Sequence, residues 1–363
     1  MTPSRPNADI DRRATHASER AFWDALRTAG RVVYLHGDYY LTDRDDILAA
    51  LRDPALVCPH MDAETFPLVP STVPHPAEHA RYRSILNPLF TPRALAPFTA
   101  AVQDHAVALV DAVADKDECD AIADIGKPLA CQTLLTLLGF PSTDLDTVIG
   151  LLDHHRAHRD DPKNNQHVID YVAHTIPRAD STGVLAALQD EFDDNEITSF
   201  VTLLFTAAVN TGIYAVGFSL VELAASPPLQ SLLRSHPDQI GAFVDEAIRL
   251  NPPITTCPRA SLTEMTIGEV TLPAGTRIVL PLQALNLDAG IDISIAYNRV
   301  RSRPSYTFAG GTRRCLGVHL ARAELIAIIT EFLRRIPEFR TADGYSVLAA
   351  EVDRYLTHLP LVW

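Results

Sequence analysis

Cys315 stands in a short loop whose composition favours metal binding. The loop runs Phe-Ala-Gly-Gly-Thr-Arg-Arg-Cys-Leu-Gly from Phe308 to Gly317. Its glycines permit tight turns, and the backbone N–H groups of a turn together with the positive end of a following helix stabilise a thiolate. That helix is predicted by apolar residues at helical spacing, namely Leu320, Ala321, Leu325, Ile328, Ile329 and Phe332. We therefore expect Cys315 to present its sulfur to a metal.

A carboxylate and a guanidinium are spaced to meet on one helix face. Glu246 and Arg249 lie on a helix predicted from about Gln239 to Leu250, which the sequence Asn251-Pro252-Pro253 cannot continue. Residues three apart share a face, so the two side chains are expected to pair. Such a pair is common on protein surfaces and contributes little there.

His79 and Arg83 form a second pair of this kind, four residues apart. Both side chains can point at one anionic group from a single helix face. An ordinary basic helix face would have the same spacing.

One long apolar helix is predicted from Glu196 to about Ala225, capped by one of the three polar residues at 193–195. It contains no charge between Glu196 and Glu222, so a transmembrane span has to be considered. The flanks are acidic, and the stretch is rich in hydroxyl and amide side chains. We expect a buried core helix that crosses the protein.

The remaining patterns indicate a mostly α fold with a small β-sheet region. Hairpins are expected from Val32–Leu35 with Tyr39–Thr42, and within Thr266–Leu280 around a turn at Pro273–Gly275. Nothing in the sequence indicates a linker, so we expect a single domain over 1–363.

Composition limits the location and the partners. The net charge of −14 disfavours nucleic acid and anionic membranes as partners. The N-terminus has no apolar run for a signal peptide or an anchor. The five cysteines include no closely spaced pair, as expected for reduced thiols in a cytoplasm.

The cysteine loop resembles the haem-thiolate signature of the cytochrome P450 superfamily at every fixed position, and the resemblance covers about 31–363. It implies a soluble, bacterial-type P450 fold, with haem b between the distal long helix and the cysteine-loop helix. It makes Cys315 the iron ligand, places Phe308 beside the sulfur, and retains Gly317 of the signature. It assigns the haem propionates to His79, Arg83, Arg259 and Arg313. A thiolate ligand favours O–O cleavage.

The resemblance also assigns the structural pair and the pocket. Glu246 and Arg249 match a buried family pair that bonds an arginine upstream of the cysteine loop, for which Arg299 is the first candidate and Arg301 the second. Small residues face the iron from the distal helix, and a wall opposes them after Pro253. The residues implied to line this substrate pocket are Ala207, Ala208, Thr211, Ile254, Thr255 and Thr256.

The implied function is monooxygenase-type oxidation of a small organic substrate in a specialised biosynthetic or catabolic pathway. The family has an acid followed by threonine on the distal helix, whereas this chain has Asn210 and Thr211 as its candidate catalytic residues. An amide does not titrate. Peroxide-driven chemistry, radical coupling and proton delivery assisted by the substrate therefore stay open, as does a non-catalytic protein that activates a partner.

Electrons are expected from another protein, because no Gly-x-Gly-x-x-Gly segment follows a strand. An acidic ferredoxin would suit the arginines near the cysteine loop, which are Arg299, Arg301, Arg303, Arg313, Arg314 and Arg322. We expect a monomer.

Overall fold

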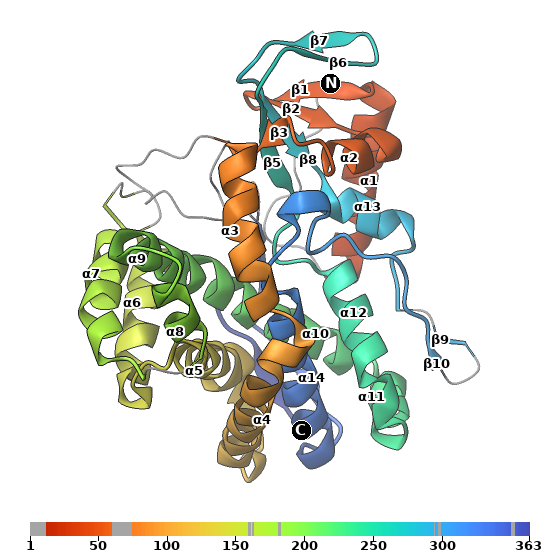
Figure 1. Ribbon diagram of the computed structural model, residues 1–363. Coiled ribbons are helices and arrows are strands. Elements are labelled where there is room, and N and C mark those ends of the chain that lie inside the picture. Colours follow the sequence, from red (N-terminus) through yellow and green to blue (C-terminus); the bar gives the residue numbers. More distant parts are fainter. Residues whose placement is uncertain are drawn as a thin grey trace.

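The computed structural model describes residues 12–59, 75–158, 161, 163–180, 183–293, 295–296, 299–349 and 353–363. Helices dominate this part of the chain, as predicted (Figure 1). The helices of its first half are α1 (Arg12–Ala29), α2 (Arg44–Ala50), α3 (Pro76–Leu89), α4 (Pro92–Ala114), α5 (Lys127–Leu138), α6 (Leu145–Ala157), α7 (Gln166–Thr175) and α8 (Gly183–Gln189). Those of its second half are α9 (Asp194–Leu203), α10 (Val209–Ala224), α11 (Pro227–Ser235), α12 (Ile240–Leu250), α13 (Leu282–Asp288) and α14 (Val318–Arg335).

The predicted long helix is present as α9, a π-helical turn over Leu204–Ala208, and α10. Asp193 caps its start, accepting a hydrogen bond from the Glu196 N–H at 2.8 Å, and Glu196 accepts one in return from the Asp193 N–H at 3.0 Å. The first N–H groups of a helix have no acceptor within the helix, and Asp193 supplies one, which explains why the helix begins there. The π turn was not predicted, because nothing in the apolar pattern distinguishes it from an α-helix.

Two helical stretches, Ala121–Leu138 and Asp194–Ala224, are long and apolar enough to cross a membrane. The protein buries 67% and 56% of their most apolar windows, respectively. Burial of this extent is typical of core helices, so length and composition alone are weak evidence for a span.

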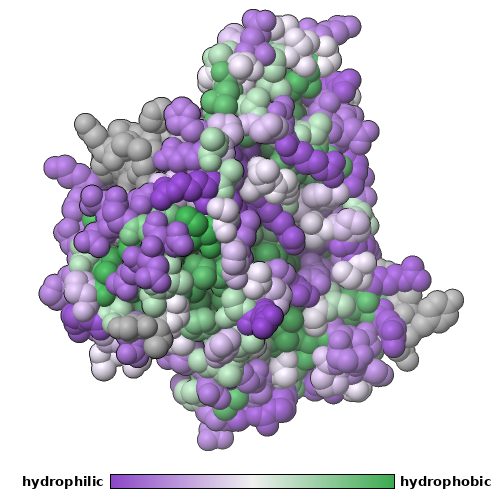
Figure 2. All heavy atoms as spheres, in the orientation of Figure 1, coloured by the Kyte–Doolittle hydropathy of each residue, from purple (hydrophilic) through white to green (hydrophobic). Residues whose placement is uncertain are grey.

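α10 lies at the centre of the helical core, against α5, α12 and α14. Gly217 lets the helix approach its neighbours, because a Cβ there would lie 2.7 Å from Cδ1 of Ile122. α14 also packs extensively against α4. Figure 2 shows apolar side chains reaching the surface beside α3, between it and the group α6 to α9.

The main sheet has the order β1-β2-β8-β5-β3 and lies beside α1 and α2, apart from the helical core (Figure 1). Its strands are β1 (Val32–Leu35), β2 (Asp38–Leu41), β3 (Leu56–Val57), β5 (Cys257–Ser261) and β8 (Arg277–Leu280). The first hairpin is confirmed within one residue. It turns at His36 and Gly37, which both have positive φ, as a tight two-residue turn requires.

The second hairpin prediction is wrong in its turn. β6 (Met265–Ile267) pairs with β7 (Val270–Leu272) across Gly268 and Glu269, and the segment Pro273–Gly275 instead leads out to β8. β8 pairs with β5 and, in parallel, with β2. The smaller pairings join β4 (Glu118–Asp120), β11 (Arg340–Thr341) and β14 (Pro360–Val362), β12 (Val347–Ala349) with β13 (Arg354–Leu356), and β9 (Ile295–Ala296) with β10 (Arg299–Val300).

Candidate functional site

The cysteine loop is a tight turn that leads into α14. Gly311 has φ of 69°, and a Cβ there would collide with the carbonyl of Leu51. The Cys315 N–H donates to the Phe308 carbonyl at 2.9 Å, which closes the loop. Gly317 precedes the first residue of α14, and a Cβ on it would meet open space.

The Cys315 residue is exposed at the surface but is closely surrounded by protein. The surrounding protein raises the pKa of the thiol through burial. The backbone N–H of Gly317 and the charges of Arg83 and Arg314 lower the same pKa. The Gly317 N–H and the two arginines stabilise the thiolate form, so the loop is suited to a cation that replaces the thiol proton.

Cationic side chains from three separate segments gather near this loop. His79 and Arg83 come from α3, Arg259 from β5, and Arg313 from the loop itself. Burial, and then the charges of Arg313, Arg83 and Arg259, lower the pKa of His79 to about 4. The structure therefore brings together residues that lie up to 234 positions apart in the sequence, the distance from His79 to Arg313.

This cluster of like charges has unused hydrogen-bonding capacity. His79 is only 4% exposed, and its Nε2 has no hydrogen-bond partner; the Nε of Arg83 is also buried without one. Arg83 donates from Nη2 to the Arg314 carbonyl at 2.8 Å, and Arg259 donates to the Pro258 carbonyl at 2.9 Å. Within the described ranges, no carboxylate forms an ion pair with His79, Arg83 or Arg259. Buried polar groups are normally satisfied, so the cluster is built for an anionic group.

The distal helix presents small side chains to an open space. Ala207 and Ala208 are exposed although they lie midway along a helix whose other faces are buried. They end the π turn, and π turns leave carbonyls without their usual helical partners. Thr211 donates from its hydroxyl to the carbonyls of Ala207 at 2.9 Å and Ala208 at 3.0 Å. Asn210 is half-buried, and its amide makes no hydrogen bond to any described residue.

The segment after α12 contributes less open surface than expected. Ile254 is half-buried and forms a β-bridge with Asp353. Thr255 and Thr256 are 0% and 1% exposed, so in this structure they lie behind the wall rather than on it. The hydroxyl of Thr256 is buried without a hydrogen-bond partner.

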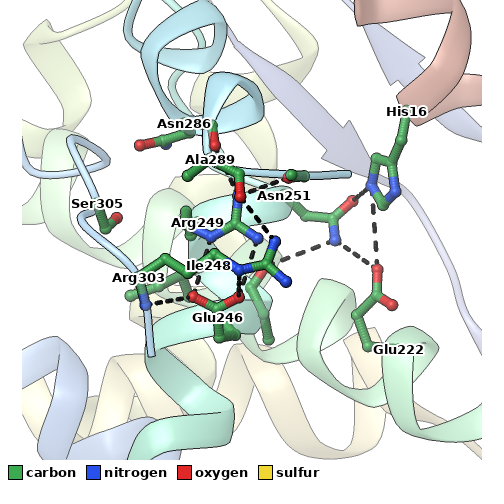
Figure 3. Close-up of polar contacts among 12 residues, drawn as sticks. His16, Glu222, Glu246, Ile248, Arg249, Asn251, Asn286, Ala289, Arg303 and Ser305 are labelled. Atoms are coloured by element: carbon green, nitrogen blue, oxygen red, sulfur yellow. Dashed lines mark hydrogen bonds and ion pairs between the residues drawn. The ribbon is translucent and has the colours of Figure 1, made fainter. Parts of the chain in front are cut away.

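Glu246 and Arg249 form the expected pair, and both side chains are fully buried (Figure 3). Arg249 donates from Nε to Oε1 at 3.0 Å and from Nη2 to Oε2 at 2.9 Å. Its Nη1 donates to the carbonyls of Asn286 at 2.6 Å and Gly290 at 2.8 Å. The pair thus ties α12 to the end of α13.

The prediction that Arg299 joins the Glu246–Arg249 pair is wrong. The arginine beside Glu246 is Arg303, whose backbone N–H donates to Oε1 at 2.8 Å and whose Nε lies 3.8 Å from Oε2 (Figure 3). Arg299 is exposed on β10, and Arg301 is exposed as well. The chain after Asn286 gives no periodic signal, so its register was not available from sequence.

Two buried networks beside this pair were missed. Asn286 accepts from the Tyr306 N–H at 2.6 Å and donates to the Thr307 hydroxyl at 3.0 Å, which fixes the approach to the cysteine loop. His16 on α1 contacts the amide oxygen of Asn251 at 2.8 Å, and Asn251 donates to Glu222 at 2.7 Å (Figure 3). Lone Asn and His residues carry no sequence signal for such contacts.

Comparisons with known proteins agree on one family. The family described as "Cytochrome P450" matches residues 146–291. A "Probable cytochrome P450 127A1" of Sinorhizobium fredii is 26% identical over 333 residues, covering 85% of this chain and 79% of the relative. The "Biotin biosynthesis cytochrome P450" of Bacillus subtilis is 27% identical over 286 residues, covering 73% and 72%.

Solved structures share the fold almost from end to end. The structure of P450BioI in complex with an acyl carrier protein ligated with hexadec-9Z-enoic acid has a TM-score of 0.84 at 23% identity, covering 96% of this chain and 100% of that one. CYP109B1 from Bacillus subtilis has a TM-score of 0.81 at 20% identity, covering 94% and 98%. With its buried Glu-x-x-Arg pair and its cysteine loop in place, the chain matches the cytochrome P450 superfamily, the haem-thiolate oxidoreductases of monooxygenase type, in sequence and in fold.

Proposed function

We propose that Cys315 is the proximal ligand of haem b, and that this P450 oxidises a small organic molecule in a specialised biosynthetic or catabolic pathway. The observation that carries the proposal is the cationic cluster beside the cysteine loop, in which two buried nitrogen atoms lack hydrogen-bond partners. A buried His79 Nε2 and a buried Arg83 Nε both lack partners, next to Arg259 and Arg313. Two carboxylates would supply the missing acceptors.

The residues present fit this prosthetic group. His79, Arg83, Arg259 and Arg313 would hold the propionates, while Phe308 would flank the sulfur of Cys315. Haem bound through a thiolate supplies the oxidising chemistry, and the protein supplies orientation and electrostatics. The loop N–H groups and Arg83 keep the sulfur ready to act as a ligand without its proton.

On the distal side, the exposed Ala207 and Ala208 would leave room for a bulky substrate, and Ile254 would close the opposite wall. Thr255 and Thr256 would support that wall from behind. Thr211 would hold a proton on its hydroxyl beside the ligand, with the carbonyls of Ala207 and Ala208 fixing its direction. The Asn210 amide would position, without titrating, whatever water lies next to it.

Electrons would come from an acidic ferredoxin docked near the cysteine loop. Arg303, Arg313 and Arg322 have internal contacts, Arg322 in a bidentate pair with Asp245 at 2.7 and 2.9 Å. The arginines left exposed for a partner are Arg299, Arg301 and Arg314. Reduction rates should fall as salt rises. We place the protein in the cytoplasm as a monomer of one domain, without a membrane or nucleic-acid partner.

The decisive experiment is the spectrum of the reduced carbon monoxide complex. Cys315→Ala should lose the red-shifted Soret band of thiolate ligation, and Cys119→Ala, a buried cysteine outside the loop, should keep it. A Cys315→Ala protein with the parent spectrum would overturn the proposal.

Asn210 favours a second possibility, in which the same site uses peroxide or one-electron oxidation instead of dioxygen. Its amide leaves the distal motif without the acid that normally exchanges protons. Thr211→Ala separates the two routes. A dioxygen route predicts that electrons are consumed without matching product, whereas a peroxide-driven reaction should be insensitive to the hydroxyl.

A further inference from the structure

An ion triad lies on the flank of the distal helix, away from the exposed alanines. Lys127 at the start of α5 contacts Asp153 at 2.7 Å, and Arg156, also on α6, contacts the other oxygen of Asp153 at 3.1 Å. Lys127 and Arg156 are 17% and 19% exposed, while Asp153 is 42% exposed. The carboxylate is therefore fixed on the inner side and open to solvent on the outer.

This triad and Asn210 line one recess, which we call the lateral recess. It is small, with a cavity volume of about 10 Å³, and it opens to solvent. Its walls are Lys127, Cys131, Ile149, Leu152, Asp153, Arg156, Asn210 and Ile213. Apolar residues make up much of the lining, so its polar groups are concentrated on the triad and on the amide of Asn210. A recess of this size and polarity has room for about one water molecule.

Asn210 and Thr211 connect the lateral recess with the distal space. Successive helical residues point about 100° apart. Asn210 lines the lateral recess, whereas the Thr211 hydroxyl donates to the carbonyls of Ala207 and Ala208, whose exposed side chains mark the distal space. The Asn210 amide has no hydrogen bond within the described residues, so both its donor and its acceptor are available to water.

We propose that Asp153 is the proton-exchanging acid of this enzyme, acting through water that Asn210 positions in the lateral recess. This inference rests on the proposed P450 function. A proton from solvent is taken up by the Asp153 carboxylate, released to a water beside Asn210, and passed to the Thr211 hydroxyl, which gives up its own proton on the distal side. Asp153 returns to a carboxylate, and no electrons move. Lys127 and Arg156 hold the acid in place.

Another acid, Glu324, lies near the same helix. Glu324 on α14 has its Oε2 3.6 Å from the position of a Cβ on Gly212, and burial raises its pKa to about 8. It does not line the lateral recess. Asp153 is favoured because it combines solvent access with the recess that contains the amide.

The first test compares Asp153→Asn with Asp146→Asn, an exposed acid on the same helix. With dioxygen and an electron donor, the fraction of electrons recovered in product should fall at least about tenfold in Asp153→Asn, and by far less with peroxide as oxidant, while Asp146→Asn behaves as the parent. Adding Asn210→Asp to Asp153→Asn should restore coupling, because the acid is moved across the recess. Parent-like coupling in Asp153→Asn, or a loss confined to Glu324→Gln, would overturn the proposal.

A second readout needs no turnover. The Asp153 carboxyl is followed by carbon NMR in the parent and in Asn210→Asp, with Asp153→Asn to assign it. Two carboxylates facing one recess repel, so the Asp153 midpoint should rise in the Asn210→Asp protein. Identical midpoints would show that the positions do not interact and would refute the relay. Identical midpoints in a protein with a normal carbon monoxide spectrum would count against the role of Asp153 alone. Loss of the thiolate spectrum in the parent protein would count against the proposed P450 function.

Discussion

The Glu246–Arg249 pair allows the most quantitative prediction. In Glu246→Ala, Arg249 keeps its bonds to the carbonyls of Asn286 and Gly290 but loses both bonds to the carboxylate. The N–H of Arg303 also loses its acceptor. Both side chains of the pair are 0% exposed, so no water replaces what is removed.

The expected cost follows from this geometry. Breaking a buried pair by removing one partner leaves an uncompensated charge and lowers the free energy of unfolding by about 3–5 kcal/mol. Because about 1.4 kcal/mol equals a factor of ten, the folding equilibrium should fall by roughly two to three and a half powers of ten. That is a large share of the stability of a typical domain. Glu246→Ala should therefore be recovered as haem-free or insoluble protein.

The assay is denaturant unfolding, with haem content measured on the same samples. Glu246→Gln keeps the shape of the side chain and an acceptor for the Arg303 N–H. It should therefore fold, and its loss of unfolding free energy can be measured even if the alanine variant does not fold. Asp24→Ala is the matched control, because Asp24 pairs with Arg20 at 3.2 Å and with Arg27 at 2.9 Å while its side chain is 49% exposed. The control should lose no more than about 1 kcal/mol.

One result would refute this reasoning. If Glu246→Ala retained full haem and lost no more stability than Asp24→Ala, the buried pair would contribute no more to the free energy of unfolding than a surface ion pair.

The same structure gives further predictions. Arg303→Ala should lower the free energy of unfolding by about 1–3 kcal/mol and the exposed Arg299→Ala by less than about 0.5 kcal/mol, as measured by denaturation. Equal losses would show that Arg303 does not support Glu246 more than Arg299 does. In haem-free protein, His79 has a depressed pKa of about 4, so the unfolded chain binds the extra proton between that pH and about 6.5. Stability should therefore be lost as the pH falls through this window, and His79→Leu should remove this dependence in thermal melts. Ala208→Phe should abolish the spectral shift caused by ligands, and an unaffected titration would move the distal pocket elsewhere.

Local sequence was enough to predict the helices that carry the chemistry. α12 begins and ends within a residue of its predicted bounds, because Pro252 and Pro253 forbid continuation. The spacing of three between Glu246 and Arg249 predicted their contact, since helical geometry alone places them on one face. Whether the pair was buried did not follow from spacing.

The environment of Asn210 shows what local pattern leaves open. The sequence identified an amide where an acid was expected, but the triad of Lys127, Asp153 and Arg156 comes from two other helices. The π turn before it was equally invisible, because its side chains fit an α-helical pattern and only the packing of the surrounding core selects the wider turn.

The sequence by itself determined the cysteine loop, the main helices and the first hairpin, because each depends on residues within a few positions of one another. Tertiary structure alone decided that Arg303, and not Arg299, reaches Glu246, and that β8 lies between β2 and β5. It also gathered the cationic cluster from α3, β5 and the cysteine loop. These outcomes depend on how distant segments pack and satisfy buried polar groups, which no local spacing encodes.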